Sequence, residues 1–82
     1  MAQPSAQTLL GQNVADLRET QGISRLSLAE RLGWTIEKVS ELEAGALDLD
    51  LDAIDQLAAA LSASPRDLFL GETDTVAERR KA

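Results

Sequence analysis

The chain has 82 residues and a net charge of −6; 44% of its residues are hydrophobic, 2% are aromatic, and none is cysteine or histidine. This length allows one small domain, and no apolar run reaches the roughly 18 residues that a membrane span needs. Because the N-terminus "MAQPSAQ" also lacks the pattern of a signal peptide, we expect a cytoplasmic protein. Without cysteine or histidine there is no disulfide, no zinc site and no Ser/His/Asp or Cys/His set, so we expect neither enzymatic activity nor a cofactor.

The first predicted helix spans residues 8–21. Ser5 or Thr8 can cap its start, and Gly22 can end it. Its inner face repeats at helical spacing in Leu10, Val14 and Leu17.

Two shorter helices follow, at residues 24–32 and 35–44. Ser24 can cap the former and Thr35 the latter, with Gly33 as the break between them. Trp34 follows this glycine and is interpreted as a residue that fills the core, with an indole N–H that needs a partner.

The segment "ALDLDLD" at 46–52 alternates like a β-strand, but we expect a loop. Asp50 or Asp52 makes a good N-cap for a helix over 51–62. The predicted inner face of that helix consists of Leu51, Ile54, Leu57, Ala58 and Leu61.

A short fifth helix is predicted at 65–70, because Ser64 and Pro65 form a typical helix start. No single helix of these lengths is stable alone in water, so the apolar stripes must bury one another. The sequence therefore predicts an all-α fold, a compact five-helix bundle.

Four segments, "LRETQGIS", "LAERLG", "VSELEAG" and "LAAALSASPRDLF", occur in an order and spacing that resembles the lambda repressor/Cro-type (XRE-like) helix-turn-helix family. The resemblance covers Leu9 to Leu70. It implies a lambda repressor-like DNA-binding domain that binds operator DNA as a homodimer, with the recognition helix at about 35–44. The domain would occupy residues 8–71, between a flexible N-terminal tail at 1–7 and a tail or linker at 72–82.

Arg18 and Glu43 match positions that often form a structural ion pair in this family. The pair would join the first helix to the end of the recognition helix. The resemblance thus implies that Glu43 belongs to the fold and that Arg18 partly neutralises its charge.

Four residues occupy positions that resemble the base-reading sites of the family: Thr35, Ile36, Glu37 and Glu41. Glutamate can accept a hydrogen bond from cytosine N4, and isoleucine can contact a thymine methyl group. The alternative is that all four are simply solvent-exposed residues of the helix.

Arg25 and Lys38 are the candidate phosphate contacts. Arg25 matches a family position that often contacts the DNA backbone, and it stands at a helix N-terminus, where amide groups favour an anion. Lys38 either reaches a phosphate or pairs with Glu41 on the same helix.

The distribution of charge leaves a second function open. The whole net charge of −6 lies within residues 9–71, with five basic residues against eleven acidic ones, whereas affinity for DNA comes largely from Lys and Arg. After Gly45, where the family often has basic or polar residues, the loop carries Asp48 and Asp50. The alternative function is a helix-turn-helix scaffold that acts through protein contacts. Its surface would be formed by apolar residues expected to face solvent, namely Leu26, Ile36, Leu47 and Leu49.

Leu68, Phe69 and Leu70 are consecutive on a short helix, so they cannot all face one core. We expect at least one of them to be available to a second chain, and the resemblance implies that dimers use this region.

Overall fold

The computed structural model describes residues 5–70, which form four α-helices followed by one 3-10 helix. The elements are α1 (Ala6–Thr20), α2 (Arg25–Leu32), α3 (Ile36–Glu43), α4 (Leu51–Ala60) and η1 (Pro65–Phe69). No strand forms within the described residues, and 46–50 is a loop that leads directly into α4, as predicted. Residues 1–4 and 71–82, which make up most of the two predicted tails, lie outside the described residues.

The fifth element corrects the prediction of a five-helix bundle, because η1 is a 3-10 helix rather than an α-helix. The Asp67 N–H donates to the carbonyl of Ser64, three residues earlier, at 3.0 Å. Such tight turns are common in short terminal pieces. The part of the chain that the structure describes is therefore all-helical, with four α-helices.

Each α-helix starts at a side chain that accepts a hydrogen bond from a backbone N–H three residues later. The caps are Ser5 (3.1 Å), Ser24 (3.0 Å), Thr35 (3.1 Å) and Asp50 (2.8 Å). Because Ser5 rather than Thr8 is the first cap, α1 begins two residues before its predicted start. These bonds satisfy amide groups that a helix start otherwise leaves without partners.

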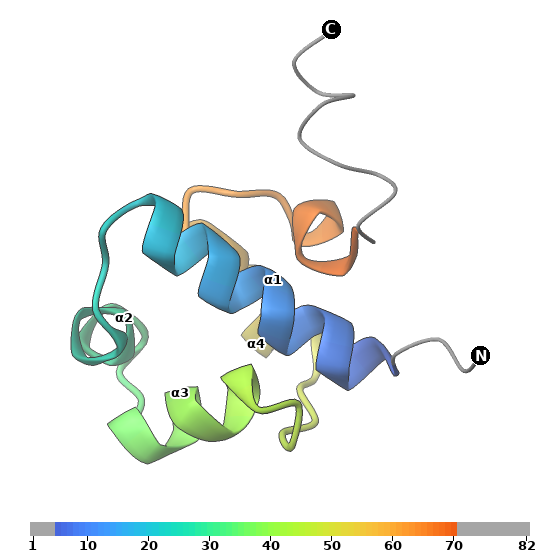
Figure 1. Ribbon diagram of the computed structural model, residues 1–82, viewed down its shortest axis with the longest axis horizontal. Helices are drawn as coiled ribbons and strands as arrows, with labels where there is room; N and C mark the ends of the chain where they lie inside the picture. The colour runs from blue at the N-terminus through green and yellow to red at the C-terminus, as the bar shows by residue number, and fades with distance from the viewer. Residues whose placement is uncertain (1–4, 71–82) are drawn as a thin grey trace, which may run out of the picture.

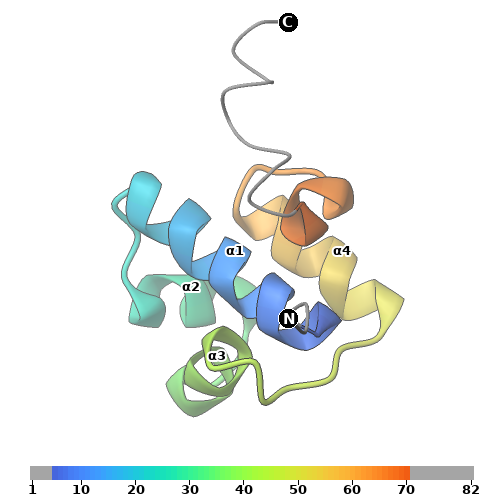
Figure 2. The ribbon, with the colours of Figure 1, turned by 45° about the vertical axis from the view of Figure 1, so that its right-hand side comes forward.

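The longest helix, α1, packs against α3 and also against η1 (Figures 1 and 2). The helix α2 packs against α3 and α4. The helix α1 lies close to α3 at Gly11, where a Cβ atom would collide with the carbonyl oxygen of Leu42 and lie 2.9 Å from that of Glu43. Only a glycine allows α1 to lie this close to the end of α3.

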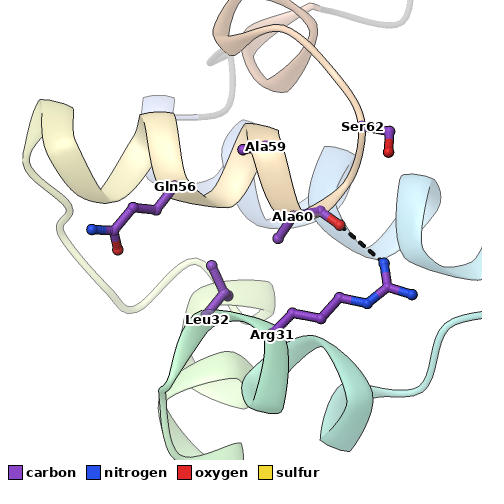
Figure 3. A pocket seen from close by; sticks show the side chains of 6 residues that line it. All are labelled: Arg31, Leu32, Gln56, Ala59, Ala60 and Ser62. Atoms are coloured by element: carbon purple, nitrogen blue, oxygen red, sulfur yellow. Dashed lines mark hydrogen bonds between the residues drawn. The ribbon is translucent and has the colours of Figure 1, made fainter.

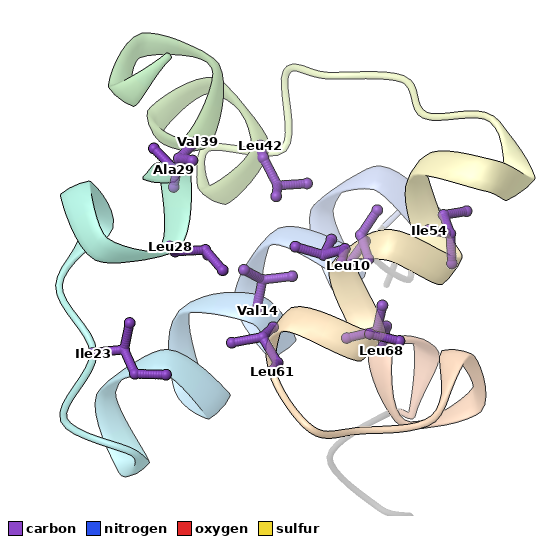
Figure 4. Close-up of a cluster of buried hydrophobic side chains, with 12 residues drawn as sticks. Leu10, Val14, Ile23, Leu28, Ala29, Val39, Leu42, Ile54, Leu61 and Leu68 are labelled. Atoms are coloured by element: carbon purple, nitrogen blue, oxygen red, sulfur yellow. The ribbon is translucent and has the colours of Figure 1, made fainter. Parts of the chain in front are cut away.

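The core is built from one apolar stripe of each helix (Figure 4). Its largest fully buried side chains are Val14, Leu28, Val39, Leu42, Leu57, Leu61 and Leu68. All are aliphatic, as the composition required. Trp34 is partly buried and packs against this cluster, in agreement with its interpretation as a core residue. Within residues 5–70, no helix combines the length and the apolar character needed to cross a lipid bilayer.

Side-chain amides of α1 hold the C-terminal part of the bundle. Asn13 Nδ2 donates to the carbonyls of Leu68 and Leu70, both at 2.8 Å, and Gln21 Nε2 donates to the carbonyl of Leu61 at 2.6 Å. The two Asn13 bonds fix η1 against α1, whereas the Gln21 bond joins the C-cap of α1 to the C-cap of α4. Leu68 is fully buried and Phe69 is 39% exposed.

Candidate nucleic-acid interface

The turn between α2 and α3 fixes the angle between the two helices. Gly33 has a left-handed φ of 70°, which a glycine adopts without a Cβ penalty. The Trp34 N–H then donates to the carbonyl of Ala29 at 2.9 Å, and the Gly33 N–H to that of Glu30 at 3.3 Å. This pattern closes the end of α2, and Thr35 caps α3 two residues after the glycine.

The helix α3 has an inner and an outer face. Val39 and Leu42 are fully buried on the inner face. The four predicted base-reading residues, Thr35, Ile36, Glu37 and Glu41, are all exposed. Ile36 is 41% exposed, and within the described residues neither Glu37 nor Glu41 has an ion-pair partner. The outer face thus presents one aliphatic and two acidic side chains on a rigid helix.

Glu43, the last residue of α3, lies in a buried cluster of charges. Its side chain is 4% exposed and that of Arg18 is 11% exposed. Arg18 Nε lies 2.7 Å from Glu43 Oε2, and Arg18 Nη2 lies 3.2 Å from Oε1. Arg18 Nη1 also donates to the carbonyl of Ile23 at 2.9 Å. The ion pair implied by the family resemblance is therefore formed, in a bidentate geometry that is the strongest kind for arginine and carboxylate.

Burial and hydrogen bonding act in opposite directions on Glu43. Burial raises the pKa of its carboxyl group, but hydrogen bonds from Arg18 and Arg25 lower it more, so the pKa lies below its ordinary value. The hydrogen bond to Glu43 raises the pKa of Arg18 against the opposing effect of burial. Both groups are charged at neutral pH.

Arg25, the first residue of α2, is the second partner of Glu43. Its Nε lies 3.0 Å from Glu43 Oε1, while its side chain remains 52% exposed. Within the described residues, Nε is the part of this guanidinium that has a hydrogen-bond partner. The sequence indicated Arg25 as a phosphate contact but gave no sign of its bond to Glu43, which lies 18 residues away on another helix.

Lys38 contacts an aromatic ring within the chain. Its Nζ lies 4.1 Å from the centroid of the Trp34 ring, a cation–π contact. No ion pair joins it to Glu41 within the described residues, so that alternative is wrong. Trp34 lies just before α3 and Lys38 lies within it, so the Lys38 ammonium group covers the half-buried indole at the start of this helix.

The predicted apolar surface is only partly present, because two of its four residues lie in the loop after Gly45 and are not exposed. Leu47 and Leu49 are partly buried and pack against the core, so they are not exposed as predicted. The two side chains lie two residues apart, which in an extended loop places them on the same side. Of the four predicted residues, Leu26 (55%) and Ile36 (41%) are exposed.

The cations of the described residues are mostly engaged within the chain. Arg18 and Arg25 bond to Glu43, Lys38 covers Trp34, and Arg31 donates to the carbonyl of Ala60. Arg66 is exposed on η1. The buried Arg18–Glu43 pair removes one charge of each sign, so the side chains at the surface of residues 5–70 remain predominantly acidic.

One large apolar side chain of α4 and one of η1 are exposed. Phe69 is 39% exposed, and Leu51, which the sequence placed on the inner face of its helix, is 79% exposed. Leu51 is the first residue of α4, at the edge of the bundle, so its spacing from Ile54 did not bring it into the core. A hollow of about 180 Å³ lies beside Phe69, and its lining consists of Ala6, Gln7, Leu10, Leu47, Asp48, Leu49, Ile54 and Phe69.

A larger hollow of about 590 Å³ lies between α2 and α4 (Figure 3). Its lining consists of Arg31, Leu32, Gln56, Ala59, Ala60 and Ser62. Arg31 Nη1 closes one side of it by a 3.1 Å bond to the carbonyl of Ala60. Arg31 is the only ionisable side chain in the lining, and no group of acidic, histidine or cysteine side chains within residues 5–70 is arranged to hold a metal ion.

Comparison with known proteins connects this arrangement to a family. The family model described as a helix-turn-helix domain matches residues 9–69. Among curated proteins, none matches the chain.

Several solved structures resemble the chain. The restriction-modification controller protein C.AhdI from Aeromonas hydrophila is 35% identical, with a TM-score of 0.73 over 77% of this chain and 96% of its own. The clp gene regulator ClgR from Corynebacterium glutamicum is 26% identical, with a TM-score of 0.79 over 83% and 87%. A hypothetical transcription factor, NHTF, from Neisseria is 27% identical, with a TM-score of 0.78 over 99% and 92%.

Proposed function

Since the chain belongs to the helix-turn-helix domain family, in its lambda repressor/Cro-type (XRE-like) branch, we propose that it is a transcription regulator that binds operator DNA as a homodimer. The observation that carries the proposal is the exposed outer face of α3, held at a fixed angle by the Gly33 turn and by the Glu43 cluster. The names of similar proteins, a controller protein, a gene regulator and a transcription factor, support it. A cytoplasmic location follows from this role, as does a binding rather than a catalytic activity.

Base reading in this proposal falls to Thr35, Ile36, Glu37 and Glu41. Each carboxylate of the outer face can accept a hydrogen bond from cytosine N4, and Ile36 can contact a thymine methyl group. A good base contact discriminates by about 1–3 kcal/mol, so two or three such contacts supply useful specificity. The two glutamates then favour sites with cytosine and disfavour close approach to phosphates.

Phosphate binding in this proposal depends on very few cations. Arg25 is half exposed at the start of α2 and is the main candidate. Lys38 would have to leave the Trp34 ring to reach a phosphate. Because each neutralised phosphate contributes about −0.9 to the slope of log affinity against log salt, we expect a shallow salt dependence for this regulator.

The proposed homodimer uses the apolar side chain that η1 exposes. Of the three residues named from the sequence, Leu68 is fully buried, Leu70 is partly buried and Phe69 is 39% exposed. Phe69 is therefore the residue of η1 that we propose as a contact with a second copy. Equilibrium sedimentation at high protein concentration tests this, since a dimer that Phe69→Ala disrupts supports the contact and a strict monomer argues against a stable dimer.

A second function is favoured by the charges. Most cations of the described residues are engaged within the chain, while Glu37 and Glu41 are exposed beside the apolar Ile36. Such a face suits a basic and apolar protein partner as well as DNA. In this alternative the chain is a scaffold with weak or no DNA binding, and Leu26 and Ile36 are the exposed apolar residues of its surface.

An electrophoretic shift titration against the DNA upstream of its own gene, at low and at moderate salt, tests the proposed function. An unrelated duplex of equal length is the control. Retarded complexes at lower protein concentration on the upstream fragment than on the control support operator binding. Absence of any complex at low salt contradicts it and favours the scaffold.

A further inference from the structure

Three charged side chains from three different helices meet at one point. Arg18 comes from α1, Arg25 from α2 and Glu43 from α3, and both arginines donate to the same carboxylate. Arg18 is buried and already satisfies Glu43 by two hydrogen bonds. The additional bond from Arg25 Nε at 3.0 Å is therefore not needed to neutralise the acid, and it restrains a side chain that is half exposed.

We propose that Glu43 is a positioning residue that holds Arg25 by its Nε so that the other edge of the guanidinium can contact a DNA phosphate. The inference rests on the proposed function, because it assigns a role within DNA binding. The guanidinium is planar and carries donors on more than one edge, so one edge can bind a carboxylate while another faces an anion. Lysine has no such second edge.

Preorganisation is the physical benefit of this arrangement. A long arginine side chain that is free in solution loses rotamer freedom when it binds a phosphate, and a side chain that is already held loses less. Arg18 also lies 3.8 Å from the exposed carboxylate of Glu19, so the four paired side chains carry no net charge. The benefit is therefore the fixed position of the Arg25 guanidinium at the start of α2, and not an excess of positive charge.

Glu43 could also weaken the binding of DNA, and the direction in which affinity changes without its charge distinguishes the two effects. A carboxylate next to Arg25 weakens the attraction between this arginine and a phosphate. If neutralisation dominates, removal of the Glu43 charge tightens binding to DNA. If positioning dominates, the same change weakens it.

The experiment measures binding to a labelled mixed-sequence duplex at several salt concentrations, by fluorescence anisotropy, for a double-mutant cycle of Glu43→Gln and Arg25→Gln. Both proteins and the double variant are measured at a temperature at which circular dichroism shows them folded. We expect each single change to weaken binding about tenfold, the scale of a lost charge-assisted hydrogen bond. We expect the double variant to bind like Arg25→Gln alone.

The salt dependence separates positioning from a purely structural role. Loss of a phosphate contact lowers the slope of log affinity against log salt by about 0.9, and a general loss of fold quality does not. We expect this lower slope in both Arg25→Gln and Glu43→Gln. Glu30→Gln, which removes the same charge from an exposed position of α2, is the matched control and should not weaken binding.

Arg25→Lys tests the inference without disturbing the buried acid. It keeps the charge but not the second edge, so we expect a loss of affinity close to that of Arg25→Gln. Wild-type affinity in Arg25→Lys, tighter binding in Glu43→Gln, or an undiminished cost of Glu43→Gln in the Arg25→Gln background would overturn the positioning role while DNA binding stands. No binding of the wild type to any duplex at low salt would overturn both.

Discussion

Glu41 and Glu43 lie two residues apart on α3 and have opposite environments. The side chain of Glu43 is 4% exposed and accepts hydrogen bonds from two arginines, whereas Glu41 is exposed and has no ion-pair partner within the described residues. Residue type and net charge are the same in both cases. The comparison shows that the three glutamates of α3 do not act alike, because the charge of Glu43 is neutralised within the fold.

The largest difference between the two regions should appear when one partner of the buried pair is removed. Arg18→Ala leaves Glu43 buried with Arg25 alone, so we expect a loss of about 3–5 kcal/mol in the free energy of unfolding. Urea denaturation measures this loss. Arg31→Ala is the control, because Arg31 is exposed and bonds to one carbonyl. Equal losses of stability in both variants would contradict a structural role for Arg18 and would make it a candidate DNA contact instead.

Gly11→Ala disturbs the backbone that carries the buried acid. An alanine Cβ would collide with the carbonyl oxygens at the end of α3, so we expect a loss of about 1–3 kcal/mol. Helix propensity alone predicts the opposite sign, a gain of about 1 kcal/mol for glycine to alanine in a helix interior. Urea denaturation distinguishes the two, because a lower free energy of unfolding in Gly11→Ala indicates the steric clash and a higher one indicates helix propensity. Gln12→Ala, an exposed neighbour on α1, should be nearly neutral.

Acid should remove the stability that the buried carboxylate of Glu43 contributes. Because the pKa of Glu43 is lower in the folded chain than its ordinary unfolded value of about 4.3, its contribution to stability is complete above that value and disappears as the pH falls through the folded pKa. We expect the stability difference between the wild type and Glu43→Gln to shrink in this acidic range. Thermal unfolding at a series of pH values measures it, and a difference that stays constant down to the acid limit would contradict the account.

The smallest effects are expected on the outer face. Glu37→Gln and Glu41→Gln change exposed side chains without partners, so we expect the free energy of unfolding to change by less than about 0.5 kcal/mol. The same urea experiment serves here. A large loss in either variant would show that the outer face contributes to folding, and the contrast with Glu43 would fail.

The helix boundaries could largely be predicted because their signals are local. Ser24, Gly33, Thr35 and Asp50 act as caps or stops as predicted, and the α-helices differ from the predicted spans by at most two residues at each end. The last element was misjudged because five residues after a proline are too few to distinguish a 3-10 turn from an α-helical one.

Contacts between distant segments were harder to predict. The Arg18–Glu43 pair followed from the family resemblance, but the bond from Arg25 to Glu43 joins α2 to α3 and leaves no spacing signal. The segment 46–52 is predicted as a loop, and 46–50 is one, but its alternation has a role in packing because it places both Leu47 and Leu49 against the core. Leu51 fits the helical spacing of the buried residues but lies at the edge of the bundle and is 79% exposed. Burial at such a position depends on whether another element covers it, which the spacing does not indicate.

The central claim is that the outer face of α3 reads DNA. The most direct measurement compares wild type, Glu37→Gln and Glu41→Gln in anisotropy titrations against the preferred upstream site and against versions of it with single base-pair changes. We predict that one of the two substitutions weakens binding to the preferred site and relaxes its preference at a cytosine position, by about 1–3 kcal/mol. If both substitutions instead tighten binding to every sequence alike, the glutamates only repel DNA and the account is contradicted.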